Sequence, residues 1–92
     1  DWPVRDLAFS PDGRLLAVAA GDGVEVRQAR SGELLRAWCE EGLSPERLRF
    51  AGRGVLFVCG SRAAVSSWDI GAGKRLRRWD GSLVADALEE RE

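Results

Sequence analysis

The chain of 92 residues contains no histidine, and this absence restricts its chemistry more than any other feature of the composition. Histidine is the most frequent general acid and base in enzymes, and Ser–His and Cys–His nucleophile arrangements both require it. Five aspartates lie at predicted turns or strand ends, where Asp has structural reasons to occur. They are Asp6, Asp12, Asp22, Asp69 and Asp80. The sequence therefore predicts no enzymatic activity, no catalytic residue and no cofactor.

Cysteine is scarce, with only two residues, Cys39 and Cys59. Two thiols without a histidine cannot complete a tetrahedral zinc site within one chain, so we expect no metal site. A disulfide would require the two Cα atoms to lie within about 7 Å. Unpaired thiols commonly act as small hydrophobic side chains. We expect reduced cysteines and a cytoplasmic location.

Long apolar runs and an excess of one charge are also missing. The chain has no stretch of about 18 apolar residues that could form a transmembrane helix, and no recognisable signal peptide. The net charge is −1, so the charge balance suggests neither a nucleic acid nor a membrane as partner. Arg75, Arg77 and Arg78 beside Trp79 admit an RNA-binding interpretation, but a charged edge strand that resists stray pairing is favoured. Methionine is absent even from position 1, which suggests a piece of a longer protein.

An internal repeat dominates what the sequence does contain. A shift of 41 residues superposes identical residues at several positions along the chain without any gap. The pairs include Phe9 and Phe50, Gly13 and Gly54, Leu15 and Leu56, Val24 and Val65, Gly32 and Gly73, Leu35 and Leu76, Arg36 and Arg77, and Trp38 and Trp79. A period of about 40 to 45 residues made of short strand-like runs is the signature of propeller blades. Each such unit cannot bury its own apolar faces and needs neighbours.

Each unit is predicted to form four short antiparallel strands joined by tight turns, which makes the chain all-β. The runs Leu15–Ala20 and Val55–Cys59 are apolar on both sides, as expected for strands buried on both faces. Turn residues such as Ser10-Pro11-Asp12-Gly13 separate the strands. The predicted strands are residues 4–9, 15–20, 24–27 and 33–38, then 47–50, 55–59, 64–70 and 74–79.

The period fails after Trp79. Leu83, Val84, Ala87 and Leu88 fall on one helical face, which favours a short frayed helix or a simple tail. We divide the chain into a first blade at residues 1–39, a second blade at residues 40–81 and a C-terminal tail at residues 82–92.

The run from Leu7 to Ala17 (LAFSPDGRLLA) resembles the inner two strands of a blade in the WD-repeat β-propeller family. Val65-Ser66-Ser67-Trp68-Asp69 resembles the third strand with its Trp-Asp pair, and the runs from Gly32 and Gly73 resemble the fourth. The resemblance covers nearly all of residues 4–79 and implies two blades. It also implies a non-catalytic scaffold that binds other proteins through loops at the narrow face of the ring.

Several positions depart from the family pattern. Blades of this family often hold a His–Asp–Ser/Thr–Trp hydrogen-bond network, and this chain has no histidine. The first unit carries Arg27 and Gln28 where the Trp-Asp pair is usual, and Arg62 stands near the turn where the second unit would have Asp. Neither blade is therefore expected to form the full network.

The narrow-face comparison implies candidate partner-binding residues before each first strand and between the second and third strands. These residues are Trp2, Arg5, Asp22, Glu46 and Arg62. Trp and Arg are the residue types that most often contribute interface energy. For Trp2, packing against a neighbouring blade is an equal alternative.

The ring poses the main physical difficulty. A closed propeller needs about four to eight blades, whereas two blades leave two apolar faces open. We therefore expect either a homo-oligomer that closes a ring from two-bladed chains, with copies of itself and other proteins as partners, or a fragment of a longer propeller from a multidomain signalling protein. An enzyme or ligand binder sited in the central channel is disfavoured. Phe57 and Phe9 are expected to be core residues.

Overall fold

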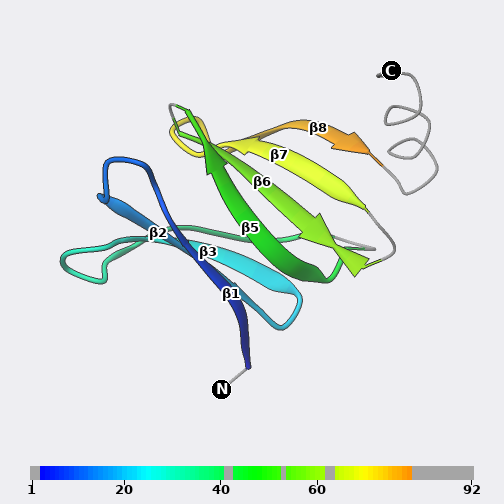
Figure 1. Cartoon of the computed structure of the whole chain (residues 1–92), viewed down its shortest axis with the longest axis horizontal. Helices are drawn as coiled ribbons and strands as arrows, with labels where there is room; N and C mark the ends of the chain where they lie inside the picture. The colour runs from blue at the N-terminus through cyan, green and yellow to red at the C-terminus, as the bar shows by residue number, and fades with distance from the viewer. Residues whose placement is uncertain (1–2, 41–42, 53, 62–63, 80–92) are drawn as a thin grey trace.

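The described part of the chain folds into eight strands in two antiparallel four-stranded sheets (Figure 1). The computed structural model describes residues 3–40, 43–52, 54–61 and 64–79. The first sheet has the order β1-β2-β3-β4 and the second β5-β6-β7-β8, so each is a simple meander and forms one blade. The strands are β1 (Val4–Phe9), β2 (Leu15–Ala20), β3 (Gly23–Gln28), β4 (Leu34–Cys39), β5 (Pro45–Ala51), β6 (Val55–Gly60), β7 (Val65–Asp69) and β8 (Lys74–Trp79). The all-β prediction of two four-stranded blades is confirmed, while the predicted helix at residues 82–92 lies outside the described residues.

The predicted turn between the first two strands forms as its residues require. The Ser10 carbonyl accepts a hydrogen bond from the Gly13 N–H at 2.8 Å. Gly13 has a φ of 75°, a conformation that glycine adopts much more readily than other residues. The Ser10 hydroxyl donates to Asp12 Oδ1 at 2.7 Å, and this bond, with that from the Arg14 N–H, lowers the pKa of the Asp12 carboxyl below its ordinary value of 3.8. Side-chain hydrogen bonds of this kind explain why a short polar run ends one strand and starts the next.

Strand pairing corrects the ungapped alignment of the repeat. Leu15 pairs with Gln28, and Val55 pairs with Asp69, so the counterpart of Leu15 is Val55 and not Leu56. The second strands therefore match with a shift of 40 residues, whereas the other strands keep 41. Counted between paired residues, blade 2 has one residue fewer than blade 1 between its first and second strands, and one residue more between its second and third strands. An error of one residue matters in a strand, because it moves a side chain to the other face.

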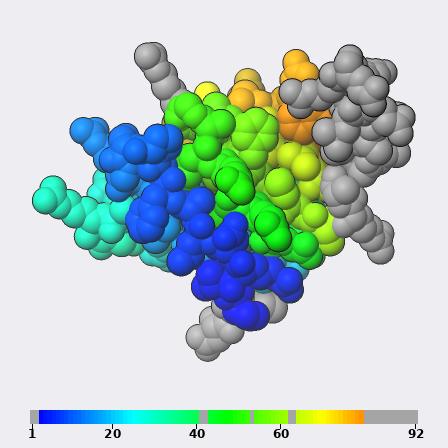
Figure 2. Space-filling model, viewed as in Figure 1, coloured from blue at the N-terminus to red at the C-terminus, as the bar shows by residue number. Residues whose placement is uncertain are grey.

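The core lies between the two sheets. Residues directly opposite one another across antiparallel strands share a face. We call the face of blade 1 that points toward blade 2 its front face, and its other face the back face. The faces of blade 2 take the names of the faces of blade 1 that they match in the repeat. The front face of blade 1 buries Ala17, Ala19, Val24 and Val26, all at most 3% exposed. It packs on the back face of blade 2, where Leu48, Leu56 and Val58 are similarly buried. Figure 2 shows β1 running beside β5 across this junction.

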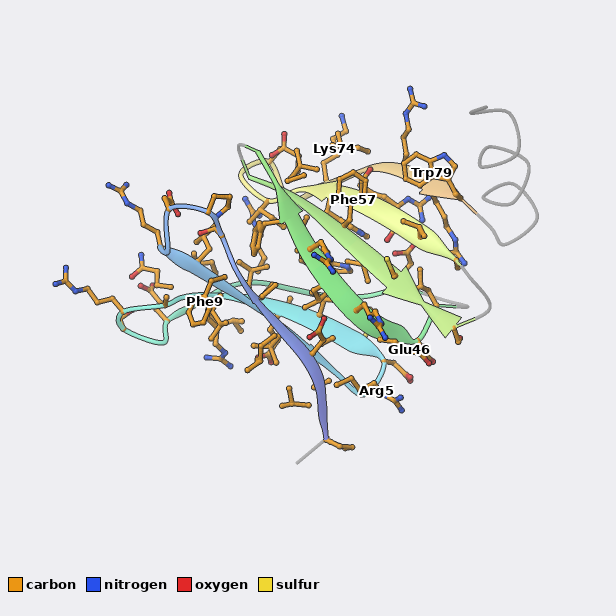
Figure 3. All side chains as sticks on the ribbon, viewed as in Figure 1. Arg5, Phe9, Glu46, Phe57, Lys74 and Trp79 are labelled. Carbon is orange, nitrogen blue, oxygen red and sulfur yellow. The ribbon has the colours of Figure 1, made fainter. Side chains whose placement is uncertain are left out.

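The other two faces have no neighbouring blade. The back face of blade 1 carries Leu7 and Phe9, which are 54% and 61% exposed. Phe57 and Trp79 lie on the front face of blade 2, where they are half-buried and their rings stack with centroids 6.5 Å apart. Phe9 lies on the opposite side of the molecule from this pair (Figure 3).

The assignment of Phe9 to the core is therefore wrong for the isolated chain. Its repeat counterpart Phe50 is packed against the core because blade 1 covers it. No blade covers Phe9 in the same way. Cys39 is exposed and Cys59 is half-buried, and both are free thiols. In the described part of the chain, no helix has the length and hydropathy needed to cross a membrane.

Leu56→Ala tests the position of the core. Leu56 is completely buried between the blades, so its truncation should cost about 2–5 kcal/mol of unfolding free energy. Leu76→Ala is the matched control, because Leu76 is 50% exposed and surface changes usually stay within about 0.5 kcal/mol. Urea unfolding followed by tryptophan fluorescence measures both, and equal effects would contradict the core described above.

Candidate interaction surfaces

The described members of the predicted partner-binding set lie at one end of the sheets. Arg5 is exposed near the start of β1, and Glu46 is exposed near the start of β5. Asp22 is exposed in the turn from β2 to β3, beside the start of β1, because Val4 pairs with Ala20. Figure 3 shows Arg5 and Glu46 at the same end of the molecule. Trp2 and Arg62 lie outside the described residues.

Arg5 and Glu46 also border an open groove between the two innermost strands. The groove has a volume of about 680 Å³ and is lined only by residues of β1 and β5. Its charged lining residues are Arg5, Asp6, Glu46, Arg47 and Arg49. Cations exceed carboxylates here, so the groove suits a polar protein segment that carries acidic or carbonyl groups.

Asp6 connects the two blades along this groove. Its Oδ2 accepts a hydrogen bond from the Leu48 backbone N–H of β5 at 2.8 Å, and its Oδ1 accepts one from the Leu7 N–H at 2.9 Å. A bulge in the pairing of β1 with β2 falls between Val4 and Asp6. The carboxylate therefore satisfies an inner-strand N–H of the next blade, which a hydrocarbon side chain could not do.

Arg36 makes a second connection near the opposite end of the blades. Its Nε donates to the Ile70 carbonyl at 3.1 Å, and its Nη2 donates to the Gly71 carbonyl at 2.7 Å. Both carbonyls belong to the turn between β7 and β8. Gly73 lies directly beneath the guanidinium, since a Cβ at this position would come within 2.6 Å of Arg36 Nη1. The planar guanidinium thus clamps blade 1 onto the backbone of blade 2.

Aromatic stacking joins the same two faces. The rings of Trp38 on β4 and Trp68 on β7 stack with centroids 4.5 Å apart. This contact places both tryptophans between the blades, and stacked pairs add about 0.5–1.5 kcal/mol beyond area burial. The Trp68 Nε1 donates to Ser66 Oγ at 2.9 Å, whereas the buried Trp38 Nε1 has no hydrogen-bond partner in the described part of the chain.

Glu40 is the centre of a hydrogen-bond network in blade 2. Its side chain is only 7% exposed and accepts from Ser66 Oγ at 2.7 Å, Arg75 Nη1 at 3.1 Å and Arg78 Nη1 at 3.2 Å. Together with the Trp68–Ser66 bond, these contacts form a Trp–Ser–Glu–Arg chain. A carboxylate therefore holds together polar groups of β7 and β8 in a chain that has no histidine for the family's network.

Sequence reasoning missed Asp6, Arg36 and Glu40 as connecting residues. For Arg36 a signal was present, because Arg36 matches Arg77 and Gly73 matches Gly32 in the repeat. For Asp6 the repeat gave no signal, because its counterpart is Arg47. Glu40 bonds side chains 26 to 38 residues further on, and no local pattern encodes such contacts.

The described residues contain no group of three or more His, Cys, Asp and Glu side chains that could hold a metal ion. In that part of the chain, acidic side chains such as Asp6 and Glu40 are occupied by backbone and arginine donors. The contacts of Asp6 and Arg36 join the two sheets, and the loop end presents the polar side chains of Arg5, Asp22 and Glu46.

Three solved structures resemble this fold closely. The chain matches the BamB protein of Moraxella catarrhalis with a TM-score of 0.74 and 14% identity, over 84% of this chain and 24% of that one. It matches the RRP9 WD40 repeats with a TM-score of 0.72 and 23% identity, over 82% of this chain and 23% of that one. It matches U3-55K with a TM-score of 0.72 and 23% identity, over 82% and 24% of the two chains.

These likenesses show that the chain has the fold of two blades of a WD-repeat β-propeller, as the resemblance in the sequence implied. The sequence matches no protein-family model and no curated protein. The chain spans about a quarter of the length of the solved structures that it matches. At these identities the likeness concerns the fold alone.

Glu40→Ala tests the network of blade 2. Removal of the carboxylate leaves Ser66, Arg75 and Arg78 without this acceptor. Breaking a fully buried ion pair costs about 3–5 kcal/mol, and partial exposure of both arginines reduces the expected loss here to about 2 kcal/mol.

The measurement is urea unfolding of Glu40→Ala, Glu40→Gln and Glu33→Ala. Glu40→Gln keeps an acceptor for Ser66 and should lose less than Glu40→Ala. Glu33 is exposed, so its removal should change stability by about 0.5 kcal/mol or less. Equal stability of the Glu40→Ala and Glu33→Ala variants would show that the network contributes nothing.

Proposed function

We propose that the chain acts as a non-catalytic protein-interaction scaffold, in which its two blades are consecutive members of a closed propeller ring. The single observation that carries this proposal is the pair of open apolar faces on opposite sides of the molecule. Val4, Leu7 and Phe9 are each more than half exposed on β1. Exposed apolar patches of this kind mark protein–protein contacts.

The leading form of the proposal is a homo-oligomer. Each chain would dock the front face of its blade 2 on the back face of blade 1 in the next copy, by the same blade order that joins the two blades within the chain. Contacts of this head-to-tail type close into cyclic rings when the rotation fits. A trimer or tetramer would give six or eight blades, within the range of known propellers.

Two observations favour a second candidate, a segment of a longer propeller that lies in a multidomain signalling protein. The chain spans only about a quarter of the structures that it resembles. In addition, the counterpart of Asp6 is Arg47, which cannot accept a backbone N–H from the next blade. A following blade of different sequence could offer Arg47 an acceptor, whereas a second copy presents the Leu7 N–H at that place.

The proposed partner surface is the loop end that carries Arg5, Asp22 and Glu46, to which the sequence adds Trp2 and Arg62. Protein partners fit this surface better than nucleic acid or membrane, because both charge signs are mixed there and the net charge of the chain is −1. A cytoplasmic location belongs to the same proposal.

Assembly is tested by molar mass in solution. We expect the chain to form a trimer or tetramer by multi-angle light scattering, and Phe9→Ala to weaken it strongly, because loss of an interfacial Phe removes about 2 kcal/mol or more. Within one chain Phe9 is 61% exposed, so the unfolding free energy of the dissociated chain should change by less than about 1 kcal/mol. A well-folded monomer at all accessible concentrations would rule out the homo-oligomer and leave the longer propeller.

Partner binding is tested by Arg5→Ala, with Arg14→Ala as the matched control. Both arginines are exposed, but Arg14 lies in the turn at the other end of blade 1. Truncation of an interfacial arginine should weaken partner binding by about 1–2 kcal/mol, while folding is unchanged. Quantitative affinity capture on immobilised chains provides the measurement, and greater loss for Arg14→Ala than for Arg5→Ala would place the binding surface elsewhere.

A further inference from the structure

The turn between β3 and β4 is the repeat counterpart of the turn that receives Arg36. Both turns close with the same hydrogen bond, from Gly32 N–H to the Gln28 carbonyl and from Gly73 N–H to the Asp69 carbonyl, each at 2.8 Å. Both glycines have a positive φ, 80° and 68°. The Ala29 and Arg30 carbonyls therefore occupy the places that the Ile70 and Gly71 carbonyls occupy in blade 2.

The receiving turn of blade 1 is open where that of blade 2 is filled. A Cβ at Gly73 would collide with the Arg36 guanidinium, whereas a Cβ at Gly32 would meet nothing within 4 Å. Among the described residues, no hydrogen bond reaches the Ala29 or Arg30 carbonyl.

The matching donor is at the other end of the chain. Arg77 is the counterpart of Arg36, because Arg36 pairs with Val26 and Arg77 pairs with Ser67 at equivalent places in the two sheets. Arg77 is exposed on β8 and makes no hydrogen bond or ion pair within the described residues. Within the described residues, Arg77 at one end of the chain thus has no hydrogen-bond acceptor, and the Ala29 and Arg30 carbonyls at the other end have no donor. We call the turn that carries these two carbonyls the guanidinium seat.

We propose that the turn at Ala29 and Arg30 is a binding site for an arginine guanidinium, and that its occupant is Arg77 of a second copy of this chain. The inference rests on the proposed homo-oligomeric ring and names the residue that completes each junction. Arg77 would donate to the Ala29 and Arg30 carbonyls as Arg36 does to the Ile70 and Gly71 carbonyls. Hydrogen bonds from an ionised donor are the stronger class, and the guanidinium supplies several in one plane.

The aromatic contact can extend across the same junction. Trp79 is the counterpart of Trp38, and Arg27 is the counterpart of Trp68, so Trp79 of one copy would meet Arg27 of the next where Trp38 meets Trp68 within the chain. A guanidinium over an indole face is a favourable cation–π pair. Arg27 is already oriented by Glu25 Oε1 at 3.0 Å and the Gly32 carbonyl at 2.8 Å.

Electrostatics at the seat set the experimental conditions. Arg30 belongs to the receiving turn, and the Arg14 carbonyl accepts the Ala29 N–H at 2.8 Å, so both arginines lie near the turn and repel an incoming cation. Gln28 stands where blade 2 has the Asp69 carboxylate. Repulsion between exposed charges is screened by salt. Association between copies is therefore measured at physiological ionic strength and above, where these two arginines oppose it least.

The test is sedimentation velocity of the full chain over a concentration series. Arg77→Ala should weaken self-association about 10- to 100-fold, the effect expected for loss of a charge-assisted contact. Lys74→Ala removes the same charge from the same strand, and its counterpart Glu33 makes no side-chain hydrogen bond or ion pair with blade 2 in the described residues, so this variant should stay close to the parent. Circular dichroism checks folding, and Arg77→Lys, which keeps the charge but loses the planar fork, replaces Arg77→Ala if that variant does not fold.

A mixing experiment tests the polarity of the contact. Ala29→Lys places a cation in the seat and leaves Arg77 intact, and the larger Ile70 at the counterpart position indicates that the turn accepts a longer side chain. Ala29→Lys and Arg77→Ala chains should each associate weakly alone, but an equimolar mixture should form a one-to-one complex that does not grow further.

The outcomes separate this inference from the proposed function. Parent-like assembly of Arg77→Ala would overturn the role of Arg77 while the ring of copies stands. Loss of assembly in Lys74→Ala to the same degree would reduce the effect to general charge and overturn the specific seat. A parent chain that stays monomeric at every salt concentration would overturn both the homo-oligomeric ring and this inference.

Discussion

Each sheet of this protein has two apolar faces and can cover neither of them alone. Within the chain one such pair of faces is covered, because the front face of blade 1 packs on the back face of blade 2. There the small side chains of Ala17 and Ala19 lie against a face that carries the larger Leu48 and Phe50. Small residues on a front face allow the following inner strand to approach, and close packing supplies the stabilisation. The corresponding front face of blade 2 carries Arg49, Phe57 and Cys59 instead of Ala8, Ala17 and Ala19, so its neighbour must have a different shape.

Polar contacts across the junction complement this packing and follow a common pattern. Asp6 and Arg36 bond to backbone groups of the neighbouring blade, at its inner strand and at its last turn. Backbone acceptors and donors are present in every repeat whatever the side chains are, so these two residues need no particular side chain on the neighbouring blade. Gly73 is the exception, because a residue with a Cβ at this position would collide with the Arg36 guanidinium.

The sequence predicted the architecture well because period-2 alternation and turn residues are local signals. All eight strands were found within a few residues, and the turn at Ser10 to Gly13 forms as its residues require. Burial was harder to predict: Phe9 and Phe50 are identical repeat partners, yet only Phe50 has a neighbouring blade. The ungapped alignment failed at Leu15 because two opposite one-residue changes in the turns cancel in the total period. The Glu40 network depends on partners far along the chain, and the absence of histidine gave no hint of what replaces it.

The position of Glu40 has a consequence for how the chain divides into units. It follows β4 of blade 1 directly, yet its carboxylate is held by Ser66, Arg75 and Arg78 of blade 2. The connecting segment is therefore, in energetic terms, the first part of the second blade and not a neutral tether. A gene fragment that starts at β5 would encode all four strands of that blade but would lack Glu40. Single-blade excisions and blade-swapped chimaeras therefore keep the Glu40 contacts only when the junction precedes this residue.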